Sequence, residues 1–125
     1  KVPVNLITDE FRTSKTFEQR KTESSSVRRR HPDRVPVICQ RSVNSDAPTI
    51  DKKKYLVPAD LTPTQFLFII RRRLSLPSEK GLFIFIDGIV PSSTSTFREL
   101  DERHRDEDGF LYLMYCRIST ESLLL

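Results

Sequence analysis

Residues 54–74, KYLVPADLTPTQFLFIIRRRL, decide the fold, because they place a short extended segment directly before a clearly marked helix. Thr62 supplies a hydroxyl at the N-cap, Pro63 occupies the first helical position, and Gln65 stands at the third. This spacing forms a capping box. The sequence therefore predicts a helix that runs from Thr62 to about Leu74 and follows a strand.

Two extended segments precede this helix. In residues 35–40 apolar side chains fall on both faces, which is typical of a strand that is covered on both sides. Residues 53–57 predict a second short strand, closed by Pro58. Residues 42–50 between them are rich in turn-forming residues, so we expect the two strands to form a hairpin.

The remaining elements follow the helix. Residues 82–86 are wholly apolar and end at an Asp-Gly turn, which predicts a strand. Thr96 and Glu99 repeat the capping-box spacing and predict a short helix over 97–104. A final strand is expected over 110–116.

The N-terminal part is more polar. Residues 1–16 are expected to be a flexible lead-in with at most a short helical turn near 9–13. Residues 17–30 lack Gly and Pro, and Thr16 and Gln19 stand at capping-box spacing before a basic end, so a helix is expected there. Its apolar content is thin, so it must pack on another part of the chain.

This order of elements predicts an α+β fold, the ubiquitin-like β-grasp, with an N-terminal helical extension. A chain of 125 residues has room for one core. We expect a lead-in over 1–16, a ubiquitin-like domain with its N-terminal helix over 17–116, and a tail over 117–125. A ferredoxin-like split would need a long second helix, and 97–104 is too short for it.

Composition limits the class of protein. The net charge is +4, and residues 1–54 hold 13 Lys and Arg against 7 Asp and Glu. The longest apolar run has seven residues, 110–116, against the roughly 20 of a membrane-spanning helix. No export signal is indicated, and Cys39 and Cys116 are expected to be reduced and buried. A cytosolic protein fits these features.

Catalytic and metal-binding patterns are lacking. Among three glycines no phosphate loop occurs, and no nucleophile-and-base signature accompanies His31 or His104. Cys39 and Cys116 are far apart and not paired with histidine at zinc-ligand spacing. We therefore expect a protein that is not an enzyme and binds no cofactor or metal.

Basic runs and one basic strand leave two kinds of binding open. The runs 28–30, 52–54 and 71–73 could follow a phosphate backbone, as in RNA binding, or form a solvated face; no aromatic residues interleave with them. A lysine-rich edge strand over 53–57 either protects the sheet from self-association or accepts a visiting strand with acidic flanks.

Four motifs in order closely resemble the autophagy ubiquitin-like modifiers of the GABARAP and microtubule-associated light-chain type. They are RRRHPDRVPVI at 28–38, DKKKYLVP at 51–58, DLT at 60–62 with Gln65-Phe66, and DEDGFLY at 106–112. The resemblance runs from about Phe11 to Tyr115. It implies a β-grasp with two helices in front, a cytoplasmic adaptor that also reaches the autophagosome membrane, and roles in autophagosome formation and cargo recruitment.

The resemblance also implies a binding site on the second strand for aromatic-x-x-aliphatic motifs of cargo receptors and autophagy proteins. The aromatic pocket would be lined by Val27, Pro36, Ile38, Lys54, Leu56 and Phe110. The aliphatic pocket would be lined by Tyr55, Val57, Pro58, Leu61, Phe66 and Ile69. Lys52, Lys54 and Arg73 would meet acidic neighbours in the ligand, with Glu23 and Arg34 near the groove.

Conjugation is the family's other activity, in which a protease, an activating enzyme and a conjugating enzyme attach a C-terminal glycine to phosphatidylethanolamine. Ser122 stands at the position that matches this glycine. Serine adds a side chain where a narrow enzyme tunnel accepts none. We therefore expect poor lipid conjugation or none. The resemblance further suggests tubulin as a partner, since the front is basic.

Overall fold

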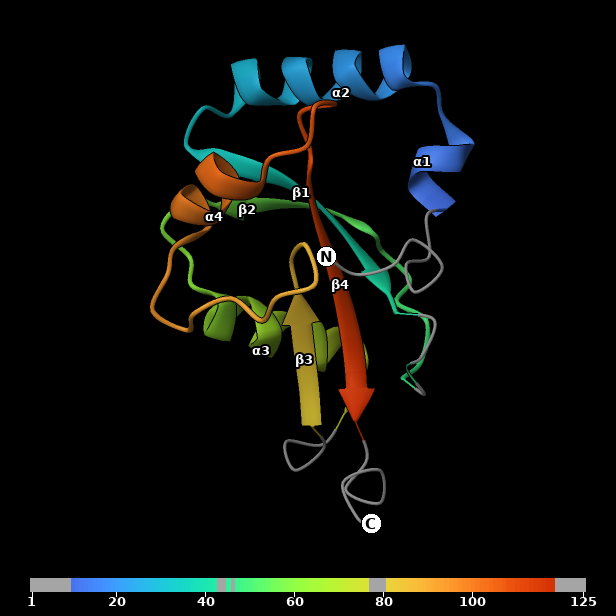
Figure 1. Ribbon diagram of the computed structural model, residues 1–125, viewed down its shortest axis with the longest axis vertical. Coiled ribbons are helices and arrows are strands. Elements are labelled where there is room, and N and C mark those ends of the chain that lie inside the picture. Colours follow the sequence, from blue (N-terminus) through green and yellow to red (C-terminus); the bar gives the residue numbers. More distant parts are fainter. Residues whose placement is uncertain (1–9, 43–44, 46, 77–80, 119–125) are drawn as a thin grey trace.

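The computed structural model describes residues 10–42, 45, 47–76 and 81–118. The expected lead-in residues 1–9, most of the expected tail and Ser122 lie outside these ranges. Two helices open the described chain, and a four-stranded sheet with two further helices follows (Figure 1). The elements are α1 (Glu10–Ser14), α2 (Phe17–Arg30), β1 (Arg34–Arg41), β2 (Lys54–Pro58), α3 (Pro63–Arg73), β3 (Gly81–Phe85), α4 (Phe97–His104) and β4 (Leu111–Ile118).

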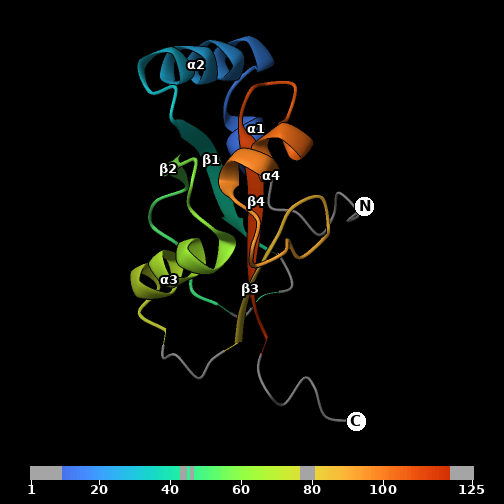
Figure 2. The same ribbon diagram turned by 90° about the vertical axis from the view of Figure 1, so that its left-hand side faces the viewer.

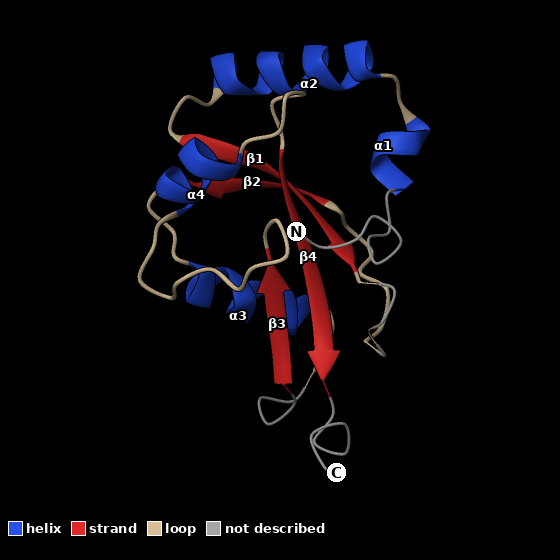
Figure 3. Ribbon diagram, viewed as in Figure 1, coloured by secondary structure: helices blue, strands red, loops and turns tan. Residues whose placement is uncertain are grey.

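The sheet has the strand order β2-β1-β4-β3 (Figure 3). β1 pairs with β2 in an antiparallel hairpin and with β4 in parallel, and β3 pairs antiparallel with β4. The predicted hairpin is therefore confirmed, and so is the α+β ubiquitin-like β-grasp. β2 and β3 form the two edges of this sheet.

Capping boxes begin three of the helices as the sequence predicted. The hydroxyls of Thr16, Thr62 and Thr96 each accept a hydrogen bond from the backbone N–H three residues on. The side-chain oxygen at that third position accepts a hydrogen bond from the cap residue's backbone N–H in each case. α2 and α4 have the predicted bounds, and α3 begins at Pro63 and ends at Arg73.

Strand bounds differ from the expectations by one or two residues. β2 includes Pro58, β3 begins at Gly81 and ends before Ile86, and β4 extends to Ile118. Pro58 is tolerated because its position at the strand end needs no N–H donor. Residues 86–89 make a tight turn with reciprocal backbone hydrogen bonds between Ile86 and Ile89, as the Asp-Gly pair predicted.

Two separate apolar clusters lie on opposite sides of β1. Val35, Val37 and Cys39 belong to the large core, which includes Phe66 and Ile70 of α3. The intervening Ile38 faces away from that core and packs with Phe11 and Phe110 in a small cluster. In Figure 2, α2 lies at the top of the view and α3 lies lower, to the left of β3 and β4. Apolar residues on both faces of β1 were predicted, and this division explains them.

Neither Cys39 nor Cys116 forms a disulfide in the described part of the chain. Cys39 is fully buried in the large core, as expected. Cys116 is only half-buried, contrary to the expectation, because it points to the face of β4 away from the core residues Leu113 and Tyr115. No helix within the described ranges combines the length and the apolar character that crossing a bilayer requires.

Candidate functional site

The lysine-bearing strand β2 lies at an edge of the sheet. It pairs only with β1 among the described strands, so one row of its backbone N–H and C=O groups faces outward. Lys54 lies opposite Ile38, Leu56 opposite Pro36, and Tyr55 opposite Val37. The register therefore places the open edge of β2 beside residues that the family resemblance assigns to the two predicted pockets.

Alternation along β2 separates those residues into two sets. Lys54 and Leu56 share the face of Ile38 and thus the side of the small cluster. Tyr55 and Val57 lie on the other face, against the large core. These four residues therefore lie on opposite faces of β2, two on the side of the small cluster and two on the side of the large core.

The residues of the predicted aromatic pocket differ in accessibility. Ile38 and Phe110 are buried, at 0% and 2% exposure. Pro36 is buried too, Val27 and Leu56 are half-buried, and Lys54 is exposed. Only the last three of these side chains are reachable from solvent.

Most residues of the predicted aliphatic pocket belong to β2 or to α3. Tyr55 packs edge-on against Phe66, with the ring centroids 5.5 Å apart. Val57 and Phe66 are buried, Leu61 is half-buried, and Ile69 is 41% exposed. Pro58 is exposed and, by alternation, falls on the side of Leu56 instead. Burial raises the pKa of the Tyr55 hydroxyl.

Glu23 forms ion pairs with two lysines beside the residues of the predicted aromatic pocket. The ammonium groups of Lys15 and Lys54 each lie 2.8 Å from a carboxylate oxygen of Glu23. Burial raises the pKa of Glu23, but the hydrogen bonds from both lysines outweigh it, so the net shift is downward. Glu23 therefore stays ionised and holds Lys54 in place.

The other charged residues of the predicted binding site are near β2 in the sequence or in the fold. Lys52 is exposed, and Arg73 forms an ion pair of 3.0 Å with Asp51. The Arg34 guanidinium donates a hydrogen bond of 3.3 Å to the Leu56 carbonyl. Since the basic runs contain several such paired residues, they are less available to a phosphate backbone than their sequence suggests.

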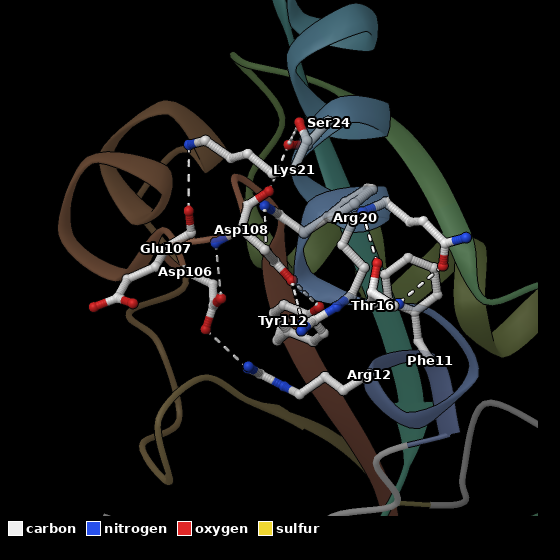
Figure 4. A network of polar contacts seen from close by, with 12 residues as sticks. Phe11, Arg12, Thr16, Arg20, Lys21, Ser24, Asp106, Glu107, Asp108 and Tyr112 are labelled. Carbon is white, nitrogen blue, oxygen red and sulfur yellow. Dashed lines mark hydrogen bonds and ion pairs between the residues drawn. The ribbon is translucent and has the colours of Figure 1, made fainter.

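Polar contacts hold α2 against the segment that leads into β4 (Figure 4). Arg20 donates a hydrogen bond of 2.9 Å to the carboxylate of Asp108, which also accepts from the Tyr112 hydroxyl. The Ser24 hydroxyl donates to the Asp108 carbonyl. Burial and the contact with Asp108 raise the pKa of Tyr112. Asp108 is fully buried, and its contacts hold α2 in place against the segment before β4.

A second polar contact holds the far end of α2. Arg28 donates two hydrogen bonds to the Asp101 carboxylate, of 2.8 and 2.9 Å, and two more to the Gly109 carbonyl. Burial raises the pKa of Asp101, but the hydrogen bonds from Arg28 and Arg105 lower it by more, so the pKa of this carboxyl is below its ordinary value. Arg28 is therefore engaged within the chain.

Sequence reasoning missed three residues that shape this region. Phe11 of α1 is 6% exposed and packs in the small cluster, although the segment was expected to be flexible up to residue 16. Phe11 is the one aromatic residue of 1–16, but a single aromatic residue does not by itself predict burial. Asp101 and Asp108 were noted only as parts of a helix and a turn motif, and no local pattern in the sequence pairs them with Arg28 and Arg20.

Comparison with known proteins agrees with this architecture. The family described as "Autophagy protein Atg8 ubiquitin like" matches residues 19–121. Autophagy-related protein 8 of Mycosarcoma maydis is 50% identical over 105 residues, which cover 84% of this chain and 89% of that protein. The Schizosaccharomyces pombe protein of the same name is 51% identical over 106 residues, covering 85% and 88%.

Solved structures extend the likeness to three dimensions. The crystal structure of Trypanosoma brucei ATG8 aligns with a TM-score of 0.86 and 39% identity, covering 91% of this chain and 98% of that one. Plasmodium falciparum Atg8, solved in complex with a P. falciparum Atg3 peptide, aligns with a TM-score of 0.78 and 31% identity, covering 86% and 98%. On its fold, its sequence and these relatives, the chain belongs to the Atg8 family of ubiquitin-like autophagy proteins.

Proposed function

We propose that this chain is an adaptor that captures aromatic-x-x-aliphatic segments of autophagy proteins and cargo receptors along the edge of β2. The observation that carries the proposal is the register of the hairpin. It puts Leu56 and Tyr55 on opposite faces of an edge strand, each beside apolar side chains. A visiting strand gains backbone hydrogen bonds there, and its side chains reach both sides.

The spacing of the motif fits this arrangement. In an extended segment, residues three apart point to opposite faces because their separation is odd. An aromatic anchor toward α2 therefore places the aliphatic anchor toward α3. The Atg3 peptide in the complex with Plasmodium falciparum Atg8 supports a peptide segment of another autophagy protein as a partner.

Charged side chains, buried anchor residues and strand hydrogen bonds together determine the expected affinity for the peptide. The exposed Lys52 and Lys54 favour acidic residues beside the motif. Two buried anchors contribute about 1.5 to 3 kcal/mol each and a few strand hydrogen bonds about 1 kcal/mol each, against the cost of association. We expect micromolar, readily reversible binding.

The test is titration of a labelled aromatic-x-x-aliphatic peptide against wild type, Leu56→Ala and the Tyr55→Ala/Leu56→Ala double variant. Binding should weaken in the single variant and be lost in the double variant, with an unchanged circular dichroism spectrum. Phe83→Ala is the matched control, because Phe83 is 39% exposed on the opposite edge strand β3. Equal affinity for all four proteins would place the peptide elsewhere.

We further propose that lipid conjugation of this chain is poor or absent, so that it stays cytoplasmic and reaches a membrane only if conjugated. The support is Ser122 at the position of the family's glycine. Reconstitution with the conjugation enzymes should give a phosphatidylethanolamine adduct for a Ser122→Gly chain ending at 122, and not for the unaltered chain. An adduct on the unaltered chain, detected by mass spectrometry, refutes the proposal.

A further inference from the structure

The hydroxyl of Tyr115 joins β4 to the connection between β1 and β2. It donates a hydrogen bond of 2.7 Å to the Pro48 carbonyl and accepts one of 2.8 Å from the Ile50 N–H. Tyr115 is fully buried in the large core, where Ile50 also packs. Burial raises the pKa of the Tyr115 hydroxyl, so the group keeps the proton that it donates. One side chain therefore binds the backbone on both sides of Thr49.

The backbone of residues 48–52 depends on this side chain. Within the described ranges, the two bonds to Tyr115 are the only hydrogen bonds that this backbone segment makes. Ile50 is the one buried residue of the segment, and the side chains of the other four are exposed. A buried N–H without an acceptor is unfavourable. The conformation of the segment therefore rests on the Ile50 side chain and the Tyr115 hydroxyl.

Lys52 ends this segment and differs from the two lysines that follow it. Lys53 forms an ion pair with Glu10, and Lys54 lies 2.8 Å from a carboxylate oxygen of Glu23. Lys52 is exposed and has no ion pair with any residue that the structure describes. Among the three lysines, Lys52 therefore has the charge that is most available to an acidic ligand.

The backbone is fixed on both sides of Lys52. Ile50 is bound to Tyr115 on one side, and on the other the Lys53 carbonyl accepts a hydrogen bond of 2.8 Å from the Cys39 N–H. We propose that Tyr115 is a positioning residue for Lys52. Its hydroxyl fixes the segment before β2, so that the Lys52 ammonium is already in place for the acidic residues beside a bound motif. The inference rests on the proposed peptide-binding function.

The experiment compares two peptides that share one aromatic-x-x-aliphatic motif. The residues beside the motif are Asp and Glu in the first peptide and Asn and Gln in the second. Affinities are measured by fluorescence anisotropy at low salt, and wild type should favour the acidic peptide about two- to fivefold. Tyr115→Phe should lower this ratio as far as Lys52→Ala does and leave the affinity for the neutral peptide unchanged. The double variant should lower the ratio no further, because both changes remove the same contact.

Tyr112→Phe is the matched control. It removes a hydroxyl from the same strand, but the hydrogen bond of that hydroxyl goes to Asp108 and not to residues 48–50. The ratio of the two affinities should therefore stay as in wild type. Amide hydrogen exchange gives a direct readout of the hydrogen bond, since the Ile50 N–H should exchange faster in Tyr115→Phe and not in Tyr112→Phe.

Each other result overturns the inference. Equal weakening of both peptides in Tyr115→Phe means that the hydroxyl only supports the fold, and an unchanged ratio means that Lys52 does not depend on it. Wild type that binds both peptides equally well shows that no lysine is placed for the acidic residues. Wild type that binds neither peptide refutes the proposed function instead.

A second variant decides should Tyr115→Phe unfold. Thr49 is exposed and lies between the two bonded backbone groups, so Thr49→Gly loosens the same segment without changing the core. A lower ratio in Thr49→Gly supports the inference, and an unchanged ratio overturns it.

Discussion

The carboxylate of Asp101 on α4 accepts two parallel hydrogen bonds from the guanidinium of Arg28 on α2, 73 residues earlier in the chain. Asp101 is 5% exposed, and Arg105 neutralises it further from one turn along α4. Removing one partner of a largely buried pair leaves the other charge without compensation. The attachment of α2 to the ubiquitin-like body therefore depends on a small number of charges.

Asp101→Asn should lower the free energy of unfolding by about 3 kcal/mol, measured by urea denaturation. Asp60→Asn is the matched control, since it makes the same change in an ion pair with Arg98 whose carboxylate is 91% exposed. A surface pair of this kind contributes about 0 to 1 kcal/mol. If both variants lose the same unfolding free energy, burial does not make the Arg28–Asp101 ion pair stronger than a surface pair.

Stability should fall in acid, and Asp101 should account for part of the fall. Its pKa is lower in the folded chain than in the unfolded one, so the unfolded state takes up the proton first. The contribution is complete above the ordinary pKa of about 3.9 and is lost as the pH falls through the folded-state value. Unfolding free energies of wild type and Asp101→Asn should therefore converge from pH 7 toward pH 2. If the difference in unfolding free energy between the two proteins is the same at every pH, the destabilisation by Asp101→Asn comes from altered packing and not from the charge.

Gly109→Ala should destabilise the chain more than Gly88→Ala. Both glycines have positive φ, 90° and 78°, which costs other residues about 1 to 2 kcal/mol. At Gly109 the added methyl would also overlap the Ser24 hydroxyl and come within 2.9 Å of its Cβ. We expect a loss of about 3 kcal/mol or more in Gly109→Ala. Equal melting temperatures of the two variants would show that α2 moves aside without cost.

Glu23→Gln should tighten the binding of peptides with an acidic residue before the aromatic anchor. The change releases the Lys54 ammonium, which Glu23 now holds at 2.8 Å. We expect a gain of about two- to fivefold at low salt. Glu18→Gln on the exposed part of α2 makes the same change in net charge and should have a smaller effect. If the two variants tighten binding equally, the effect is one of net charge alone.

The two thiols should differ in reactivity. Burial raises the pKa of Cys39 to about 12, so it is protonated and shielded in the folded chain. Cys116 is half-buried. A thiol reagent at pH 8 should label one cysteine of the folded protein and both in urea, since the thiolate is the reactive form. Cys116→Ser should then show no rapid labelling; rapid labelling in that variant would mean that Cys39 becomes exposed.

The helices and the order of the elements along the chain were predictable because their signals are local. A threonine cap with a matching third residue determines where α2, α3 and α4 begin, whatever the rest of the chain does. Alternating apolar residues identified β1 as covered on both faces. The strand ends were less certain, since Pro58 and Ile118 depend on pairing with partners far along the chain.

The geometry of the candidate site was only partly predictable. The two-sided placement of Leu56 and Tyr55 follows from alternation once β2 is recognised as a strand. The burial of Phe11 could not be derived, because a five-residue helix has no stability of its own and forms through contacts with Gln40 and Phe110. The link between Arg28 and Asp101 likewise joins elements whose packing no local pattern encodes.

The division of the apolar interior by β1 has an evolutionary consequence. The large cluster holds the fold together, whereas the small one of Phe11, Ile38 and Phe110 lies on the other side of β1 and includes two residues of the proposed aromatic pocket. Substitutions in the latter can alter which partners are chosen while folding continues to depend on the former. Related chains can in this way diverge in selectivity from a common, stable scaffold.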